Sequence, residues 1–246
     1  MNTLERRKFQ LHADTDKYRR RIEKAKDWIH DVFRRFENPC LNYSGGKDSL
    51  VLLHLTAVAC GYDDVDIYHF DNGLLRVPGS DDFVRESVDR FGGNLFVRTS
   101  EAANNEEMVV EQGHGYNGFW GQYHSLVQEH EWDIRLLGIR ADESRNRRDR
   151  FDSSGDEPPI NWHEEFTAAA PIHHFTTRDV WAYIVENELK YHDIYDKQGE
   201  LYGDIEHRGN RLVTIYDSEF DHLGDLEVSQ FLYPGATNEL KDIEQS

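Results

Sequence analysis

Short apolar segments alternate with longer amphipathic segments over most of the chain, and this alternation restricts the folds that it can adopt. The short segments predict strands over residues 40–43, 65–70, 94–98, 134–139 and 168–172. Helical spacing of apolar residues predicts helices over residues 48–60, 80–91, 119–130 and 177–187. Strands separated by helices favour parallel pairing, because each crossover returns the chain to the same end of the sheet. We therefore expect an α/β fold with a doubly wound, mostly parallel five-stranded sheet.

The two ends of the chain differ from this alternating middle. Apolar residues recur three and four positions apart within residues 3–37, which predicts one long helix that stops at Asn38 and Pro39. From about residue 191 the sequence is irregular and acidic. We expect a helical segment that packs on the core (residues 1–37), an α/β domain (38–190) and a tail that contacts substrate or a partner (191–246). Residues 151–166 read as a loop, and Ser80 is expected to cap the helix over residues 80–91.

The net charge of −19 limits the partners that this surface attracts. Dense carboxylates repel nucleic acid and acidic membranes, so a nucleic-acid substrate would need a local basic groove or a basic partner. Such acidity is typical of proteins from a high-salt cytoplasm, but it also occurs in ordinary acidic enzymes. The composition leaves both origins open.

Cysteine content and hydropathy exclude several other classes. The two cysteines, Cys40 and Cys60, are too few for a disulfide scaffold or for a zinc or iron–sulfur site built from this chain's own thiols. No segment approaches the roughly 18 consecutive apolar residues of a membrane span. The charged N-terminus lacks the apolar run of a secretory signal, which predicts a cytoplasmic protein.

The hexapeptide SGGKDS lies between the first predicted strand and the helix that follows it. Its glycines, Gly45 and Gly46, allow the backbone to bring N–H groups close to an anion, and the start of the helix adds partial positive charge. Lys47 supplies a full positive charge, while Ser44 and Ser49 supply hydroxyl groups. Together these features predict a site that binds pyrophosphate.

Asp48 has two alternative roles in this hexapeptide, since it could hold a magnesium ion or cap the helix. The pattern is not a Walker A loop, which needs four residues between its glycines and a Ser or Thr directly after the lysine. The alternative to a phosphate site is an ordinary glycine turn with a capping aspartate. The complete hexapeptide at the end of a strand favours the phosphate site.

A second polar element follows the fourth predicted strand. That strand ends at Gly138 or Ile139, which places Arg140 at the same edge of the sheet as the hexapeptide. Five arginines lie within this element of an otherwise acidic chain: Arg140, Arg145, Arg147, Arg148 and Arg150. Guanidinium groups bind phosphate oxygens through paired hydrogen bonds and stay charged. We expect Arg140 and Arg147 to bind phosphate; a solvated helix face is the alternative, above all for the other three.

Four motifs together resemble one protein family. SGGKDS matches the S-G-G-x-D-S signature of the PP-loop ATP pyrophosphatases, and HFDNG at residues 69–73 is similar to their aromatic-Asp-Thr-Gly element, with Asn72 in place of threonine. GIRADESRNR at residues 138–147 resembles their G-x-R-x-x-[EQ]-S-x-x-R element, and Pro171 with residues 179–184 resembles a later P…DVWxYI segment. The resemblance covers about residues 22–196. It is strongest to the phosphoadenosine phosphosulfate reductase-like branch, which also includes ATP sulfurylase small subunits and the DNA phosphorothioation ATPase.

The resemblance implies a Rossmann-like fold of the adenine nucleotide alpha hydrolase type and an enzyme that uses ATP and Mg²⁺. Members attack the α-phosphorus of ATP, release pyrophosphate and leave an adenylylated product, so this chain is expected to be an adenylyltransferase-type ATP pyrophosphatase. The expected catalytic residues are Lys47, Asp48, Arg140 and Arg147, with Asp48 also as metal ligand. The expected nucleotide-binding residues are Ser44, Gly45, Gly46, Ser49, Asp71 and Gly138, although Asp71 could instead only open the turn after its strand.

Two other functions stay open from the sequence. Sulfonucleotide reductases of this branch use a cysteine near the C-terminus, and no cysteine follows Cys60, so a reductase would need a thiol from elsewhere. The chain could also be a non-catalytic nucleotide-binding subunit of a phosphorothioation-type complex. The sequence predicts a nucleotide substrate and no membrane, and it leaves the acceptor open between sulfate and nucleic acid. It also leaves open a homo-oligomer or a partner subunit.

Overall fold

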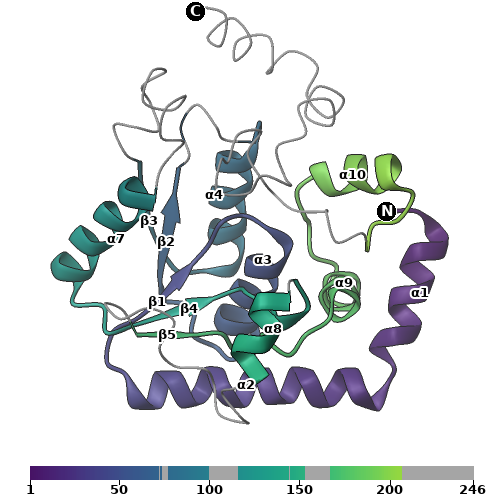
Figure 1. The fold of residues 1–246 in the computed structure, drawn as a ribbon, viewed down its shortest axis with the longest axis horizontal. Helices are drawn as coiled ribbons and strands as arrows, with labels where there is room; N and C mark the ends of the chain where they lie inside the picture. The colour runs from purple at the N-terminus through teal and green to yellow at the C-terminus, as the bar shows by residue number, and fades with distance from the viewer. Residues whose placement is uncertain (72, 74–76, 100–115, 144, 153–166, 207–246) are drawn as a thin grey trace, which may run out of the picture.

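The computed structural model describes residues 1–71, 73, 77–99, 116–143, 145–152 and 167–206. Its centre is a sheet of five strands: β1 (Pro39–Asn42), β2 (Asp66–Phe70), β3 (Asn94–Arg98), β4 (Ile134–Leu137) and β5 (Ala168–Ala169). All neighbouring strands pair in parallel, in the order β3-β2-β1-β4-β5 (Figure 1). The predicted α/β class and parallel sheet are therefore confirmed.

The described helices surround this sheet. They are α1 (Thr3–Ala13), α2 (Asp16–Arg35), α3 (Lys47–His54), α4 (Ser80–Phe91), α7 (Tyr116–His130), α8 (Arg145–Asp152), α9 (Thr177–Glu186) and α10 (Ile194–Tyr202). A π-helical turn, Leu55–Ala59, continues α3, and the Cys60 N–H closes it on the Leu55 carbonyl oxygen (2.9 Å). Across the described segments, every helix is too short or too polar to cross a membrane.

Side chains of β1 alternate between two apolar clusters, one on each face of the sheet. Leu41 belongs to the larger cluster, in which α2, α3, α4 and α9 cover one face. Cys40 belongs to the smaller cluster, in which Tyr123 and Leu126 of α7 cover the opposite face. Both β1 side chains are fully buried. This distribution of helices over both faces confirms that the sheet is doubly wound.

The N-terminal segment consists of two helices, so the prediction of a single helix over residues 3–37 is wrong. Apolar residues recur at helical spacing on both sides of the break, but none lies between Ala13 and Tyr18, and Thr15 has an extended backbone. Its hydroxyl oxygen accepts a hydrogen bond from the Tyr18 N–H (3.3 Å) and so caps the start of α2. The break allows α1 to turn away from the axis of α2 and to pack on α9 (Figure 1).

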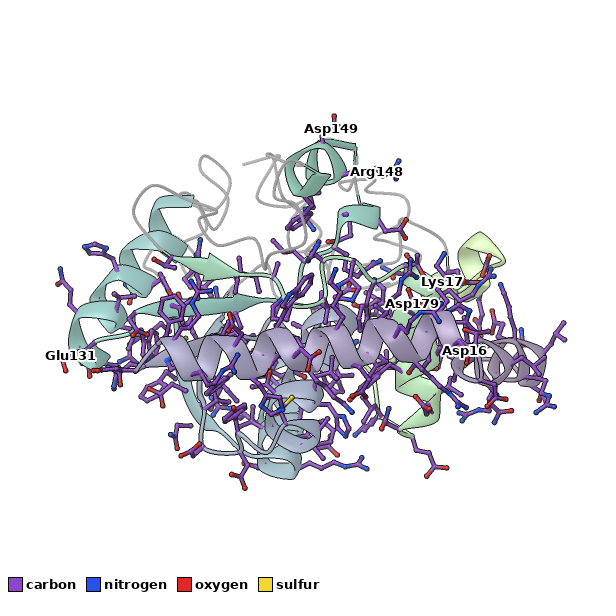
Figure 2. All side chains as sticks on the ribbon, turned by 90° about the horizontal axis from the view of Figure 1, so that it is seen from below. Asp16, Lys17, Glu131, Arg148, Asp149 and Asp179 are labelled. Carbon is purple, nitrogen blue, oxygen red and sulfur yellow. The ribbon has the colours of Figure 1, made fainter. Side chains whose placement is uncertain are left out.

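A buried carboxylate ties the N-terminal helices to α9. Asp179, in the first turn of α9 as predicted, is 0% exposed. It pairs with Arg21 of α2, lies 2.7 Å from Nε2 of His12 in α1, and accepts hydrogen bonds from the N–H and hydroxyl of Thr176 (2.7 Å each). Figure 2 shows Asp179 beside the N-terminal part of α2. Because a buried carboxylate is costly unless its oxygens are satisfied, this set of partners fixes the position of both helices.

The start of α4 differs from the prediction. Gly79 is the N-cap residue, not Ser80, and it has a positive φ of 81° that favours glycine. The Gly79 carbonyl oxygen accepts the N–H of Phe83 (3.1 Å), which makes it the first acceptor of the helix. Ser80 is instead buried within the first turn.

The strand β5 is also shorter than predicted. It covers Ala168–Ala169 and does not continue to residue 172. The reason is a turn, in which the His173 N–H donates to the Ala170 carbonyl oxygen (3.0 Å) and the Phe175 N–H donates to the Ile172 carbonyl oxygen (2.9 Å). Carbonyl groups that accept bonds within a turn are not available to extend a strand ladder.

The segment after residue 190 contains a helix, so the prediction of an irregular tail is wrong for its first part. Ile194, Tyr195 and Gln198 are buried along one side of α10. Gly203 follows it with a positive φ of 70° and ends the helix. The rest of the predicted tail (207–246) and most of the predicted loop (153–166) lie outside the described residues.

Trp181 of α9 tests the packing between α1, α9 and α10. Its indole N–H donates to the Ile205 carbonyl oxygen (3.1 Å), and its ring packs against Phe9 and Tyr195. Replacing Trp181 with alanine is expected to lower the free energy of unfolding by about 3–5 kcal/mol, because it leaves a large cavity and an unsatisfied carbonyl group. Urea denaturation measures this loss. The control is Leu4→Ala, at a leucine that is 80% exposed; equal losses in both variants would contradict the packing described.

Candidate functional site

β1 is the strand at which the connections of the sheet change direction. β2 and β3 lie on one side of it, whereas β4 and β5 lie on the other. In parallel α/β sheets, ligands bind at such a point, beyond the carboxyl ends of the strands. The hexapeptide follows β1 and the arginine element follows β4, so strand pairing brings the two predicted phosphate-binding elements together (Figure 1).

The hexapeptide places glycine backbone at the start of α3. Gly45 has a positive φ of 78°, and Gly46 is the N-cap residue, which carries no side chain that could cap the helix. Ser44 Oγ accepts the Gly46 N–H (3.3 Å) and lies 3.1 Å from Ser49 Oγ, which donates to the Gly46 carbonyl oxygen (3.0 Å). The two serines therefore brace the loop from within, and their predicted role in nucleotide binding stays a prediction.

Asp48 lies between two buried cations. Its Oδ1 accepts a hydrogen bond from Nε of Arg140 (2.5 Å), and its Oδ2 lies 3.2 Å from Nζ of Lys47. The side chains of Asp48, Arg140 and Lys47 are 14%, 3% and 4% exposed. Nη1 of Arg140 also lies 3.6 Å from Oδ2 of Asp142, a carboxylate that is 31% exposed. The more deeply buried part of the group therefore holds two cations and one carboxylate. Such a group attracts an anionic ligand.

Burial and mutual attraction set the charge states of this triad. Burial lowers the pKa of Lys47 and Arg140 lowers it further, whereas the negative charge of Asp48 opposes both effects. Burial also opposes ionisation of Asp48, but attraction to Arg140 and Lys47 outweighs it and lowers the pKa of that carboxyl. Burial likewise opposes the charge of Arg140, yet Asp48 and Glu143 raise its pKa. Asp48 therefore stays ionised at neutral pH, and the charge of Lys47 depends on it.

Gly138 allows the end of β4 to approach the first turn of α3. A Cβ atom at Gly138 would lie 2.7 Å from Cα and 2.8 Å from the backbone nitrogen of Ser49. Both are backbone atoms, so they cannot move aside as a flexible side chain could. Gly138 thus contributes to the site through close packing, which is needed if Arg140 is to reach Asp48. Its predicted contact with nucleotide stays a prediction.

Two carboxylates fix the turn after β4. Glu143 Oε2 accepts the Arg140 N–H (2.7 Å) and pairs with Arg147. Asp142 Oδ2 accepts the N–H (3.1 Å) and hydroxyl (3.2 Å) of Thr177, and the same hydroxyl oxygen accepts Nη1 of Arg140 (3.3 Å). Arg140 is thus held by protein groups, whereas Arg147 is 28% exposed, and its predicted contact with phosphate stays a prediction.

The other predicted site residues lie after β2, at the same end of the sheet as the hexapeptide, or on α8. Asp71 Oδ1 accepts the Gly73 N–H (2.8 Å), so it closes the turn after β2, the strand next to β1. Arg148 is exposed, and Figure 2 shows it on the outer side of α8. The side chains of Arg145 and Arg150 lie outside the described residues. Among the arginine side chains that the structure describes, Arg140 contacts the hexapeptide, through Asp48.

Tyr195 of α10 also contacts the hexapeptide, and sequence analysis missed it. Its hydroxyl oxygen accepts the backbone N–H of Lys47 (2.9 Å). The ammonium group of Lys47 lies 5.2 Å from the centre of its ring. The only signal was the sequence Tyr-Asp at residues 195–196, near the end of the family resemblance. In a single sequence, nothing links that pair to a lysine 148 positions earlier.

Comparison with known proteins agrees with this geometry. The family model described as the phosphoadenosine phosphosulfate reductase domain matches residues 38–231. The chain belongs to this family. The matched range contains the hexapeptide, the arginine element and Tyr195, so the family resemblance read from the motifs is confirmed.

Relatives of this family member include two that carry the name sulfate adenylyltransferase subunit 2. The one from Mycolicibacterium vanbaalenii is 30% identical over 194 residues, which cover 68% of this chain and 60% of the relative. The one from Baumannia cicadellinicola is 25% identical over 228 residues, which cover 78% of this chain and 70% of the relative. The chain therefore spans about 60% of the length of the first relative.

A solved structure supports the fold of this family member. Phosphoadenylyl-sulfate reductase from Candida auris, in complex with phosphate, aligns with a TM-score of 0.55 over 70% of this chain and 84% of the reductase. The sequences are 16% identical, so the likeness concerns the fold alone.

Gly138→Ala tests the close approach of β4 to α3. The variant is expected to lose about 1–3 kcal/mol of unfolding free energy, because the added methyl group pushes against backbone atoms. Gly121→Ala is the matched control, since a Cβ atom at Gly121 in α7 meets nothing within 4 Å. We expect the control to be neutral or slightly stabilising. Thermal and urea unfolding measure both, and a neutral Gly138→Ala would refute the tight approach.

Proposed function

We propose that this chain binds ATP at the start of α3 and transfers AMP to an oxyanion acceptor. An acceptor oxygen attacks the α-phosphorus and forms a new P–O bond, while the bond from that phosphorus to the bridging oxygen of the β-phosphate breaks. Pyrophosphate leaves with the electron pair of the broken bond. The two buried cations, Lys47 and Arg140, carry this proposal, because charge that moves onto pyrophosphate is stabilised by fixed cations in a site with little water.

The residues of the site suggest a division of roles. We assign the β- and γ-phosphates to the loop at Gly45 and Gly46 and to the ammonium group of Lys47. Arg147, which is partly exposed, is assigned to phosphate oxygens at the mouth of the site. Arg140, whose guanidinium group is held by Asp48 and Thr177, positions the other groups. Catalysis then rests on orientation and electrostatics, with no resident general base.

The described residues do not fit a resident magnesium ion at Asp48. Both oxygens of Asp48 already contact a cation, so a metal on either oxygen must displace Lys47 or Arg140. The parts of the chain that the structure describes also contain no cluster of three His, Cys, Asp or Glu side chains suited to a metal. We therefore treat magnesium as part of the substrate, bound to the phosphates of ATP. The role of Asp48 as a metal ligand stays a prediction that this geometry does not favour.

The relatives favour sulfate as the acceptor. Both relatives are named sulfate adenylyltransferase, and sulfate supplies the anionic oxygen that the proposed attack requires. The same name describes them as subunit 2, from which we propose that this chain also acts with a partner subunit. The cations Lys47, Arg140 and Arg147 suit a substrate pair in which both members are anions.

A reductase that uses this chain's own thiols has less support. A nucleophilic cysteine needs an accessible thiolate. Burial raises the pKa of Cys40, which is fully buried on β1, and it raises the pKa of Cys60 to about 11. The sequence contains no other cysteine. Both thiols therefore stay protonated at neutral pH.

Lys47→Ala tests the proposed function directly. The variant is expected to release pyrophosphate at least about 100-fold more slowly and to bind ATP more weakly, because it lacks the ammonium group that contacts the leaving phosphates. ATP labelled at the α- or γ-phosphorus, with Mg²⁺ and sulfate, shows which products form. Calorimetry measures ATP binding. Lys190→Ala, at a lysine that is 61% exposed, is the control and should behave as the wild type.

Two outcomes would contradict the proposal. One is a Lys47→Ala variant that keeps the wild-type rate of pyrophosphate release and the wild-type affinity for ATP. The other is a wild type that forms ADP and inorganic phosphate, because cleavage would then fall between the β- and γ-phosphates. Circular dichroism of each variant establishes that it is folded before its activity is compared.

The variant Asp48→Asn tests whether Asp48 acts as the counter-ion of Lys47 and Arg140 or as a ligand of Mg²⁺. If Asp48 serves Lys47 and Arg140, the variant binds ATP more weakly, yet the Mg²⁺ concentration that gives half-maximal ATP binding is unchanged. If Asp48 binds the metal, that concentration rises by about tenfold or more, as losses at metal sites commonly do. Calorimetric titrations over a series of Mg²⁺ concentrations distinguish the two.

A further inference from the structure

We propose that Tyr195 is a positioning residue for Lys47: its hydroxyl group fixes the first N–H of α3, and its ring holds the lysine ammonium group in place. The inference rests on the proposed function only in that Lys47 is taken to contact phosphate. It assigns a role in the site to α10, a helix that lies beyond the last strand of the sheet and that none of the motifs indicated.

Two different parts of the Tyr195 side chain make the two contacts. The hydroxyl oxygen lies 2.9 Å from the backbone nitrogen of Lys47, and the centre of the ring lies 5.2 Å from Nζ of the same residue. Tyr195 is 1% exposed, so both contacts are made away from bulk water. Because hydroxyl and ring act separately, substitutions can remove one contact and keep the other.

The hydroxyl contact determines which donors of α3 are left for a ligand. The first N–H groups of a helix have no acceptor within the helix, and an anion commonly takes them. Here the Lys47 N–H, the first of α3, is already bound by Tyr195. A phosphate at this helix start is therefore directed to the Gly45 amide, to Nζ of Lys47, and to the Gly46 amide, whose longer contact with Ser44 Oγ (3.3 Å) it would have to replace. By occupying the first N–H of α3, the hydroxyl group thus sets where the phosphates bind relative to the start of the helix.

The ring contact bears on the charge of Lys47. Among the described residues, the ionic groups that act on this lysine include Asp48 in α3, Arg140 after β4, and Glu143 in the short 3-10 helix Ala141–Glu143. Burial and Arg140 disfavour the ammonium form, whereas Asp48 and Glu143 favour it. The face of an aromatic ring also attracts a cation, most strongly where water is excluded. Tyr195 of α10 therefore supports the charged form that phosphate binding requires.

The surroundings of Tyr195 keep it in this position. Its ring packs edge-on against Trp181 of α9, at 5.5 Å between ring centres and an angle of 83°. Its backbone N–H donates to the His192 carbonyl oxygen (3.2 Å). Trp181 in turn packs on Phe9 of α1. The tyrosine is thus held by α9 and by its own backbone next to Lys47.

The ring contribution is tested by the titration of Lys47 without nucleotide. The chain has eight lysines, so protein labelled with [6-¹³C]lysine gives few signals, and the signal absent from Lys47→Arg belongs to Lys47. In Tyr195→Leu, the midpoint of its titration is expected to fall by about 0.5–1.5 pH units, from the usual strength of a buried cation–π contact. Tyr195→Phe keeps the ring and is expected to keep the midpoint.

Tyr191→Leu is the matched control for this titration. Tyr191 also packs against Trp181 and Tyr195, but its hydroxyl group donates to Asp196. A purely structural role of the tyrosine cluster would move the Lys47 midpoint equally in Tyr191→Leu and Tyr195→Leu, and that result would overturn the proposal. If Tyr195→Leu does not fold, Tyr195→Met, which retains more volume, takes its place.

The hydroxyl contribution is tested by hydrogen exchange of the Lys47 amide in [¹⁵N]lysine-labelled protein. Tyr195→Phe removes the acceptor, so exchange of this amide is expected to become about tenfold faster, which corresponds to one modest hydrogen bond. Tyr191→Phe should leave the rate unchanged. An unchanged rate in Tyr195→Phe would show that the hydroxyl group does not fix this amide.

Activity then separates this inference from the proposed function. If both hold, the alkaline limit of pyrophosphate release shifts in Tyr195→Leu by the same amount as the Lys47 midpoint and does not shift in Tyr195→Phe. A shifted Lys47 midpoint in a chain that releases no pyrophosphate would contradict the proposed function and leave the role of Tyr195 intact. An unshifted Lys47 midpoint in a chain that releases pyrophosphate normally would contradict the role of Tyr195 and leave the proposed function intact.

Discussion

The carboxylate of Asp48 is the group on which the rest of the site depends. Lys47 and Arg140 are both almost fully buried, and two like charges cannot stay buried side by side without a counter-ion. One carboxylate oxygen of Asp48 contacts Lys47, and the other contacts Arg140. It reaches Arg140 only because β1 and β4 are neighbours in the sheet and because Gly138 lets the end of β4 approach the start of α3. The contact between Asp48 and Arg140 therefore couples the site to the pairing of β1 with β4.

The helices outside the sheet support this arrangement from one side. Asp179 ties α1 and α2 to α9, Trp181 of α9 packs on Tyr195, and Tyr195 of α10 contacts Lys47. Segments from both ends of the described chain thus converge on the first residue of α3. This explains why α10 is helical despite its acidic sequence: one side of it is buried against these groups, and tertiary packing outweighs local preference.

The sequence predicted much of the fold because its signals there are local. Strands and helices of the sheet have periodic apolar residues, and the hexapeptide and Arg140 lie directly after strands, so a parallel sheet was enough to place them at one edge. The break at Thr15 was missed because apolar residues recur at helical spacing on both sides of it, and the five-residue step from Ala13 to Tyr18 was not taken as an interruption. The pairing of Asp48 with Arg140, and the contact of Tyr195 with Lys47, were missed because they depend on side-chain geometry between distant segments. From the sequence Asp48 was a metal ligand or a cap, whereas in the structure α3 has no side-chain cap and Asp48 serves as a counter-ion.

The most direct test of this account is a crystal structure of the chain with magnesium and an ATP analogue that has a methylene group between the α- and β-phosphorus atoms. The account predicts that β- and γ-phosphate oxygens lie within about 3 Å of Nζ of Lys47 and of the amides at Gly45 and Gly46, while Asp48 still bonds to Arg140. A nucleotide bound away from the start of α3, or a metal ion on Asp48 with Arg140 displaced, would contradict it.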